Sequence, residues 1–327
     1  MIQRYKNMRG RLLGLCLVIF AAVSCTYDYF EDENNFKIYI PQLQDGTIDN
    51  VLVSIHDASG THRYTRFIEG PFDPNTIGRD GILRFKLPWG GGYKVSAFAN
   101  VDEASCDMGK PYQDSHISEP LLGNAGTVHT PGPNFRVVLQ DDITSYPLEH
   151  PMAGVADTVN LAKDSVYKAS VLCEFRELPA AVARIDIQYM GVGTHMSFDG
   201  CYRRPAGGYV QSSHEVSSSG ADFTTGPDYV FPSGGTHYAD PNRNTTTREA
   251  MDLVVRFYDA NGSVMGVFSG FDQDTPPTVT DPKGNAVPWS FHLDPRHQVK
   301  FVFKGFFVFG IELVGWGDIE QGEVTPM

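Results

Sequence analysis

Alternation of apolar and polar residues is the feature that most limits how this chain can fold. Within residues 51–56, the apolar side chains of Val51, Val53 and Ile55 recur at every second position. Successive side chains of a β-strand point to opposite faces, so this period places the apolar side chains on one buried face. Helical periodicity is scarce along the sequence. The pattern therefore predicts an all-β fold.

Segments of the same kind recur along the chain, and turn signals rich in glycine, proline and aspartate separate them. Residues 203–250 are predicted to form long loops with short strands, and residues 141–161 show no clear strand and are predicted to be a junction. We therefore expect a first domain at 36–145 and a second at 155–327. The predicted strands are 36–40, 51–56, 82–87, 93–99, 135–139, 166–175, 182–190, 253–258, 290–293, 299–303 and 306–313.

Two short stretches, residues 53–60 and 255–262, resemble each other closely. In both, an alternating strand enters an Asp-Ala-x-Gly turn and a second strand follows. The aspartate can accept hydrogen bonds from the turn backbone, and the glycine tolerates a positive φ. The repetition predicts two hairpins of the same build and two sandwich domains of similar architecture.

The apolar stretch 301–316 has the composition of a membrane helix in part, but it contains Lys304, Glu312 and glycines at 305, 310 and 315. Valine and phenylalanine dominate the remainder. Two adjacent core strands are the better interpretation of this stretch.

The N-terminus has the pattern of a secretory signal. Four basic residues lie within the first eleven positions, and residues 12–23 carry no charge. The run is shorter than the roughly 20 apolar residues that span a membrane. Small Ser24 precedes Cys25, as in bacterial lipoprotein signals. We expect residues 1–24 to be removed and Cys25 to carry fatty acyl chains such as palmitate; an ordinary signal with a fortuitous cysteine is the alternative.

Residues 25–35 are acidic and lack any period, so they are predicted to be a tether. An acidic stretch directly after a lipid-bearing cysteine resembles the export signal of lipoproteins in Bacteroidota. That resemblance implies the outer face of the outer membrane, and a solvated spacer is the alternative. Several acyl chains hold a protein on a bilayer, since each buried methylene contributes roughly 0.8 kcal/mol.

Charge limits the partners of the mature chain. Four of the 26 basic residues lie in the signal, which leaves 22 against 39 acidic residues and a formal charge of −17. Such a surface repels nucleic acid and anionic lipid head groups. Partners are therefore expected to be neutral or basic, with no nucleic acid among them.

Three cysteines remain after the signal region: Cys106, Cys173 and Cys201. An odd number cannot form a complete disulfide framework, and their spacing matches no zinc motif. Cys173 falls inside an apolar strand pattern and is predicted to be a small core residue. One bridge, between Cys106 and Cys201, is compatible with the count.

No motif for catalysis, phosphate binding or metal binding occurs in the sequence. His292 and His297 lack a metal-ligand spacing, and the loop with Asp272 and Asp274 lacks the continuation of a calcium site. The chain is therefore predicted not to be an enzyme and to need no cofactor or metal. Two tryptophans beside turns could stack on a sugar ring or line the rim of a core: Trp89 and Trp289.

The chain resembles the FimB-type fimbrial anchor lipoproteins of Bacteroidota over most of its mature length. The family tends to show a Tyr-x-Val-x-Ala-Trp-x-Asn pattern, in which Phe98 replaces the tryptophan here. The motifs that carry the resemblance are structural: Cys25-Thr-Tyr-Asp-Tyr29, residues 51–60, residues 92–100, residues 178–187 and the aromatic end near Trp316.

The resemblance implies two tandem transthyretin-like β-sandwich domains after the lipoprotein signal and tether. It also implies a subunit that fastens a fimbrium to the cell outer membrane and helps to limit its length. Two Asp-Thr/Ser-Val triplets resemble the O-glycosylation sequon of this phylum, which makes Thr158 and Ser165 candidate glycosylation sites.

The function predicted from the sequence is that of a surface-exposed, lipid-anchored base subunit that binds fimbrial pilin subunits. An open sheet edge supplies unpaired backbone donors and acceptors, so strand pairing is the expected mode of binding. A strand within residues 299–313 is the expected docking element. A fimbrial tip or stalk subunit and a surface glycan-binding lipoprotein are the alternatives.

Overall fold

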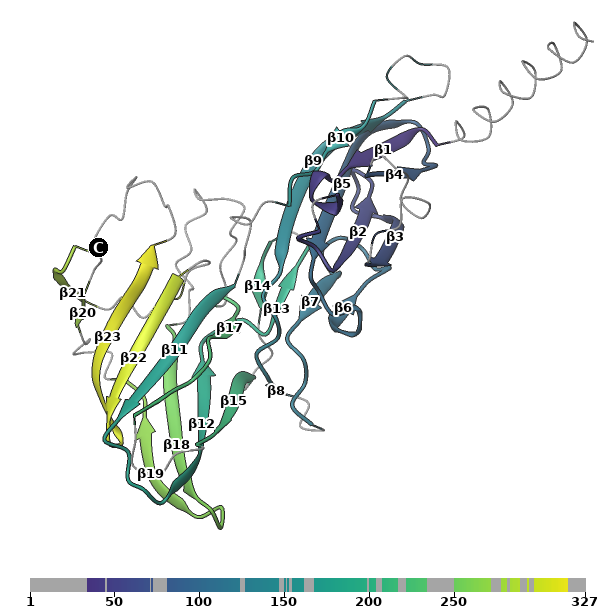
Figure 1. Ribbon diagram of the computed structural model, residues 1–327. Helices are drawn as coiled ribbons and strands as arrows, with labels where there is room; N and C mark the ends of the chain where they lie inside the picture. Colours follow the sequence, from purple (N-terminus) through teal and green to yellow (C-terminus); the bar gives the residue numbers. More distant parts are fainter. Residues whose placement is uncertain are drawn as a thin grey trace, which may run out of the picture.

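The computed structural model describes residues 34–44, 46–70, 72, 81–123, 127–146, 150, 152, 155–161, 168–198, 200–203, 208–216, 222–233, 250–271, 278–280, 283–288, 293 and 297–316. Within these ranges the chain forms strands β1 to β23 and two short 3-10 helices, at Pro41–Leu43 and Glu103–Ser105. The strands build two lobes in contact with each other (Figure 1). The predicted all-β class is confirmed.

The N-terminal lobe packs a three-stranded sheet of order β10-β1-β4 against a four-stranded sheet of order β3-β2-β5-β9. Apolar side chains of both sheets form one core, in which Ile38, Val53 and Val95 are buried. The strands are β1 (Phe36–Tyr39), β2 (Asn50–His56), β3 (His62–Glu69), β4 (Ile82–Phe85), β5 (Gly90–Ala99), β9 (Arg136–Ser145) and β10 (Asp157–Thr158).

The C-terminal lobe packs a sheet of order β19-β18-β12-β15-β8 against one of order β16-β11-β22-β23-β20-β21, in which β17 also pairs with β11. Its core contains Val171, Ile187 and Phe301. The strands are β8 (Val128–His129), β11 (Ala169–Arg176), β12 (Val182–Met190), β15 (Tyr209–Glu215), β16 (Phe223–Thr224), β17 (Asp228–Val230), β18 (Asp252–Asp259), β19 (Val264–Ser269), β20 (Thr278–Thr280), β21 (Ala286–Pro288), β22 (His297–Lys304) and β23 (Phe307–Trp316).

A fifth, short sheet joins the lobes, and we call it the bridging sheet. Its order is β14-β13-β7-β6, with β6 (Cys106–Asp107), β7 (His116–Ser118), β13 (His195–Ser197) and β14 (Tyr202–Arg203). It lies between the two lobes in Figure 1. A separate core beside it takes side chains from both halves of the sequence, among them Phe98, Phe135, Phe198 and Phe231.

The chain crosses between the lobes more than once. Strands β7 and β8 precede residue 145 but pair with β13 and β15, and β10 follows residue 155 but pairs with β1. The two-sandwich architecture expected from the sequence agrees with the two packed lobes. The domain limits at residues 145 and 155 stay a prediction.

The expectation of no strand within residues 141–161 is wrong at both ends. Strand β9 continues to Ser145, which pairs with Gly90, and the two-residue strand β10 pairs with β1. A register shift next to Asp141 and Asp142 interrupts the alternation, and Asp142 adopts a φ of 61°. A β-bulge of this kind hides the period of a strand from sequence analysis.

The predicted strand pair within residues 301–316 is confirmed. Strands β22 and β23 are antiparallel, and Gly305 turns the chain between them at a φ of 58°. Residues 290–292, part of another predicted strand, lie outside the described residues. No helix in the described ranges is long and apolar enough to cross a membrane.

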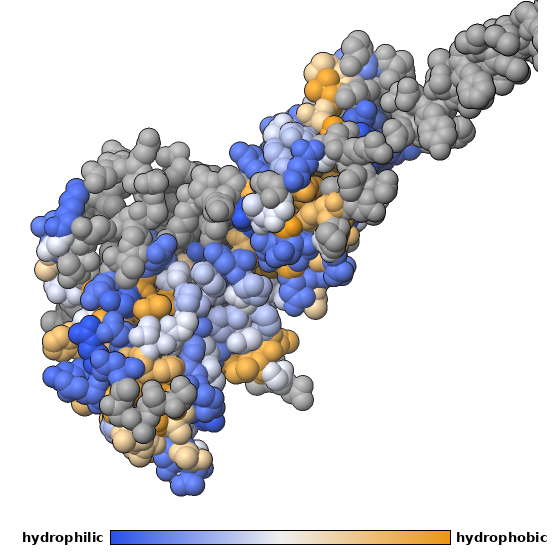
Figure 2. All heavy atoms as spheres, viewed as in Figure 1, coloured by the Kyte–Doolittle hydropathy of each residue, from blue (hydrophilic) through white to orange (hydrophobic). Residues whose placement is uncertain are grey.

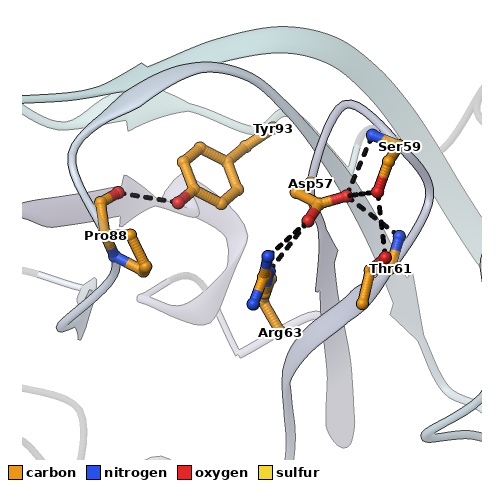
Figure 3. Close-up of polar contacts among 6 residues, drawn as sticks. All are labelled: Asp57, Ser59, Thr61, Arg63, Pro88 and Tyr93. Atoms are coloured by element: carbon orange, nitrogen blue, oxygen red, sulfur yellow. Dashed lines mark hydrogen bonds and ion pairs between the residues drawn. The ribbon is translucent and has the colours of Figure 1, made fainter.

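The two predicted hairpins have the same turn. Asp57 Oδ1 accepts hydrogen bonds from the backbone N–H groups of Ser59 and Thr61, at 2.9 and 3.0 Å (Figure 3). The carboxylate of Asp259 holds its own turn in the same way, at 2.9 and 2.8 Å. The glycines have φ values of 82° at Gly60 and 81° at Gly262. The sequence repeat thus encodes one turn geometry in both lobes.

The first of these turns carries an additional ion pair, because Arg63 Nη2 lies 2.6 Å from Asp57 Oδ2 (Figure 3). Hydrogen bonding by the Ser59 side chain and by the Thr61 backbone, together with the arginine, lowers the pKa of Asp57 to about 2. The carboxylate therefore stays ionised, and the turn keeps its acceptor, over the physiological pH range.

Replacing Gly262 with alanine should destabilise the protein by about 1–2 kcal/mol, the penalty of a left-handed conformation for an L-residue. A methyl group at Gly262 would meet no atom within 4 Å, so crowding makes no contribution. Gly226→Ala is the matched control, since its Cβ also meets nothing and its φ is not positive. Urea denaturation should separate the two variants, and equal stability would contradict the turn geometry.

Candidate functional site

The sequence-predicted modification sites fall mostly outside the described residues. Cys25 and Ser165 both lie there. Thr158 is described: it is exposed on β10 and pairs with Tyr39 of β1. Burial raises the pKa of the neighbouring Asp157. Thr158 as a glycosylation site stays a prediction.

The side chains considered for ligand binding are dispersed. Trp89 is 74% exposed beside the start of β5, so it is not a core-rim residue. His297 is half-buried on β22. No group of three or more metal-ligating side chains occurs within the ranges that the structure describes. Four further candidates lie outside those ranges: Trp289, His292, Asp272 and Asp274.

None of the three remaining cysteines takes part in a disulfide within the described residues. Cys173 is buried in the C-terminal core, as predicted. Cys106 and Cys201 do not form the bridge that their count allowed, because they lie at opposite edges of the bridging sheet, on β6 and directly before β14. Three strand spacings are roughly 14 Å, more than a disulfide spans. Burial raises the pKa of Cys106 to about 12, so this thiol is unreactive at neutral pH.

The expected docking region, residues 299–313, contains one interior strand and one partly open strand. β22 pairs with β11 on one side and with β23 on the other, so both of its edges are occupied. β23 pairs with β22 along its length, but β20 covers its other edge only at Ile311 and Glu312. Residues 307–310 therefore have an edge without a strand partner in the described part of the chain, and we call them the open edge.

Two large aromatic side chains project from the open edge. Phe307 is 73% exposed and Phe309 is 70% exposed. Phe307 and Phe309 alternate with Val308, which packs on the core. The register shifts between Val302 and Phe303, and this β-bulge at Phe309 brings Ile311 back to the core side as well. Sequence alternation alone could not find this, because every residue from 306 to 309 is apolar.

The start of β23 lies close to the opposite sheet. The ring of Phe306, in the turn before β23, packs against Phe257 at a centroid distance of 4.8 Å and leaves no room for a side chain at Gly266 of β19. Figure 2 shows apolar side chains at the lower end of the C-terminal lobe, where the β18–β19 and β22–β23 turns lie in Figure 1. The open edge therefore belongs to the end of the lobe farthest from β1.

β19 is the other exposed edge of this lobe. It pairs with β18 and with no other strand of the described chain, and its sequence Val-Met-Gly-Val-Phe-Ser contains neither a charge nor a proline. Val264 is 54% exposed and Val267 is 46% exposed. Proteins usually protect sheet edges with charged residues or prolines, so an edge without them is competent to pair with another strand.

A row of charged side chains borders the open edge. Lys300 Nζ lies 3.3 Å from Glu174 and 2.5 Å from Glu312, across three neighbouring strands. The hydrogen bonds that Lys300 donates to Glu312 and to Glu174 raise the pKa of Lys300. These exposed pairs contribute little to stability. They limit the apolar surface to the first residues of β23.

A buried ion pair lies where the two lobes meet. Lys168 Nζ is 2.7 Å from Glu119 Oε2, and the two side chains are 3% and 0% exposed. Glu119 Oε2 also accepts a hydrogen bond from the N–H of Gly132 at 2.9 Å. The ammonium lies over the rings of Phe231 and Phe135, at 4.8 and 5.7 Å from their centroids. Burial raises the pKa of Glu119 and lowers that of Lys168, and each charge opposes the shift of its partner.

Lys168→Met should lower the free energy of unfolding by about 3–5 kcal/mol, because it leaves a buried carboxylate without its counter-charge. The double variant with Glu119→Gln should recover much of this loss, since the amide is neutral and can still accept from Gly132. Urea denaturation of the wild type and of both variants provides the measurement. A double variant no more stable than the single one would show that packing of the lysine stem, rather than charge, matters there.

No protein-family model matches the chain, and no curated protein sequence matches it. Several solved structures do resemble it. A candidate adhesin from Bacteroides ovatus aligns with a TM-score of 0.47 and 17% identity, over 72% of this chain and 81% of that one.

Two fimbrial proteins from Porphyromonas gingivalis also resemble the chain, each at 11% identity. The fimbrial anchor protein Mfa2 aligns with a TM-score of 0.44 over 82% of this chain and 89% of its own. The tip fimbrial protein Mfa3, in a C-terminally truncated form, aligns with a TM-score of 0.34 over 85% and 96%. These are proteins of the class that the sequence motifs resemble. At such identities and TM-scores, nothing about the function of this chain follows from the likeness.

Proposed function

We propose that this chain is a lipid-anchored base subunit of a fimbrium, attached to the cell outer membrane and exposed at the surface. The proposal is supported by the combination of the lipoprotein signal predicted for residues 1–24, directly before Cys25, with an open, aromatic-bearing sheet edge at residues 307–310. Acyl chains on Cys25 provide the attachment. The open edge provides backbone groups for a neighbouring pilin.

The arrangement of the lobes supports membrane attachment at one end of the molecule and pilin binding at the other. β1, which follows the predicted tether in the sequence, lies at one end of the N-terminal lobe, and the start of β23 lies at the far end of the C-terminal lobe (Figure 1). A strand that pairs with the open edge would complete the ladder beyond β20, and its apolar side chains would cover Phe307 and Phe309. The membrane and the fimbrium would then be held at opposite ends.

Cys25→Ala should release fimbriae into the medium, because the base subunit would lose its acyl chains. Immunoblots of cell and supernatant fractions, with a pilin antibody, measure the shift. Cys16→Ala, in the same signal region, is the matched control and should leave the fimbriae on the cells. Fimbriae that stay cell-bound in the Cys25 variant would count against a base subunit and favour a tip position.

Phe307→Asp combined with Phe309→Asp should reduce co-purification of the subunit with fimbriae by at least about tenfold, since a charge on this edge blocks strand pairing. Both side chains are largely exposed, so the melting temperature should change little. The matched control places the same charges on the other apolar edge, as Val264→Asp with Val267→Asp. Loss of co-purification in the control alone would move the docking site to β19.

A surface glycan-binding lipoprotein is the second candidate, and the 74% exposure of Trp89 favours it. An exposed indole presents a flat apolar face on which a sugar ring can stack. Under this alternative, the protein is retarded in a polysaccharide affinity gel and Trp89→Ala abolishes the retardation. Equal mobility of wild type and variant would remove this candidate.

A further inference from the structure

The bridging sheet and strand β8 of the C-terminal lobe bring several basic side chains together where the two lobes meet. His116 of β7 and His195 of β13 have ring centroids 5.0 Å apart. Arg203 of β14 pairs directly opposite His195 in the strand register. His129 of β8 is buried and donates a hydrogen bond from Nδ1 to the carbonyl oxygen of Glu119 at 2.8 Å. Like charges on neighbouring strands are destabilising, so this cluster holds together best when its histidines are neutral.

The acidic side chains around the cluster already have partners. Asp107 of β6 lies 3.9 Å from His116 Nε2 but forms a closer ion pair with Lys110. Glu119, which follows β7, forms the buried ion pair with Lys168. His195 Nδ1 lies 3.4 Å from the hydroxyl oxygen of Thr194, within hydrogen-bonding distance. Within the described chain, no carboxylate is placed to neutralise a proton on His195.

The environment of His195 therefore opposes its protonation. Burial, followed by the charges of His116, Arg203 and His129, lowers the pKa of His195 to about 4. His56 lies at the same junction, fully buried, with its ring against Phe198 from the other half of the sequence. Burial lowers its pKa as well, and its Nδ1 has no hydrogen-bond partner among the described residues.

The pairing that these histidines would disturb is short. β7 and β13 share three residue pairs, from His195–Ser118 to Ser197–His116, and β6 and β7 share two. The cores of the N-terminal and C-terminal lobes, by contrast, are built mainly from apolar side chains, and the buried histidines of the described chain, His56 and His129, lie at the junction. Protonation is therefore expected to act first on the joint, where the histidines lie, and only afterwards on the packing inside each lobe.

We propose that the bridging sheet is a pH-sensitive joint, in which protonation of its clustered histidines weakens the pairing of β7 with β13 and frees the lobes to move relative to each other. An open joint exposes His195 to water and returns its pKa towards the ordinary value of about 6.5. Between about pH 6.5 and pH 4 the open state therefore binds more protons than the closed state. Stability of the joint is complete above this window and is lost as the pH falls through it.

Hydrogen exchange of the full mature chain at pH 7.5 and pH 5 tests the proposal, after correction for the intrinsic rates at each pH. Exchange in residues 116–118 and 195–197 should rise on the order of tenfold at pH 5, while residues 51–53 of β2 and strand β18 stay protected. His195→Gln keeps a neutral polar side chain and should reduce this rise severalfold. His150→Gln, at an exposed position away from the joint, is the control and should behave as the wild type.

Equal protection of the bridging strands at both pH values would overturn the proposal, and so would an undiminished rise in His195→Gln. Arg203→Gln provides a second variant if His195→Gln fails to fold, because it removes one positive neighbour and leaves the histidine in place. The acid-induced rise should then be smaller than in the wild type. Simultaneous loss of protection in residues 51–53 of β2 and in β18 would indicate global unfolding and would also contradict a joint that opens by itself.

Discussion

The ion pair between Glu119 and Lys168 is the contact on which the two-lobed arrangement depends. Glu119 directly follows β7, and Lys168 directly precedes β11, so the pair connects the bridging sheet to the first long strand of the C-terminal lobe. A side chain at Gly132 would lie 2.9 Å from Glu119 Oε2, which leaves room only for hydrogen there. Buried ion pairs add little net stability but penalise alternative arrangements strongly, since separation would strand a charge in an apolar site. Here that penalty favours the arrangement of the lobes in which Glu119 and Lys168 lie side by side.

Apart from this junction, the molecule consists of two buried cores and several exposed surface features that a partner could contact. Each lobe encloses an apolar core between two sheets. The features available to a partner lie at the periphery: the open edge of β23, the unprotected strand β19 and the exposed ring of Trp89. This distribution suits recognition by strand pairing or stacking, in which backbone groups and flat rings act at a surface.

Local patterns predicted the elements whose contacts are local. The period-two segment at 182–190 coincides with β12, and the two Asp-Ala-x-Gly turns adopt the predicted carboxylate-to-backbone hydrogen bonds. The β-bulges that interrupt the alternating pattern could not be predicted from the sequence. The bulge at Asp142 hid the last residues of β9, and the bulge at Phe309 was invisible in a uniformly apolar run. In both cases one extra residue, held by the neighbouring strand, changed which face a side chain occupies.

The sequence by itself determined the all-β class, the two hairpin turns and the paired C-terminal strands, because each depends on residues within a few positions of one another. Only the tertiary structure decided that β7 and β8 cross to the second half, that Lys168 reaches Glu119, and that Cys106 and Cys201 lie at opposite edges of one sheet. Pairing between distant strands depends on the packing of the whole chain. A strand of two or three residues is too short to show an alternating pattern, so neither the strand nor its partner can be predicted from the sequence.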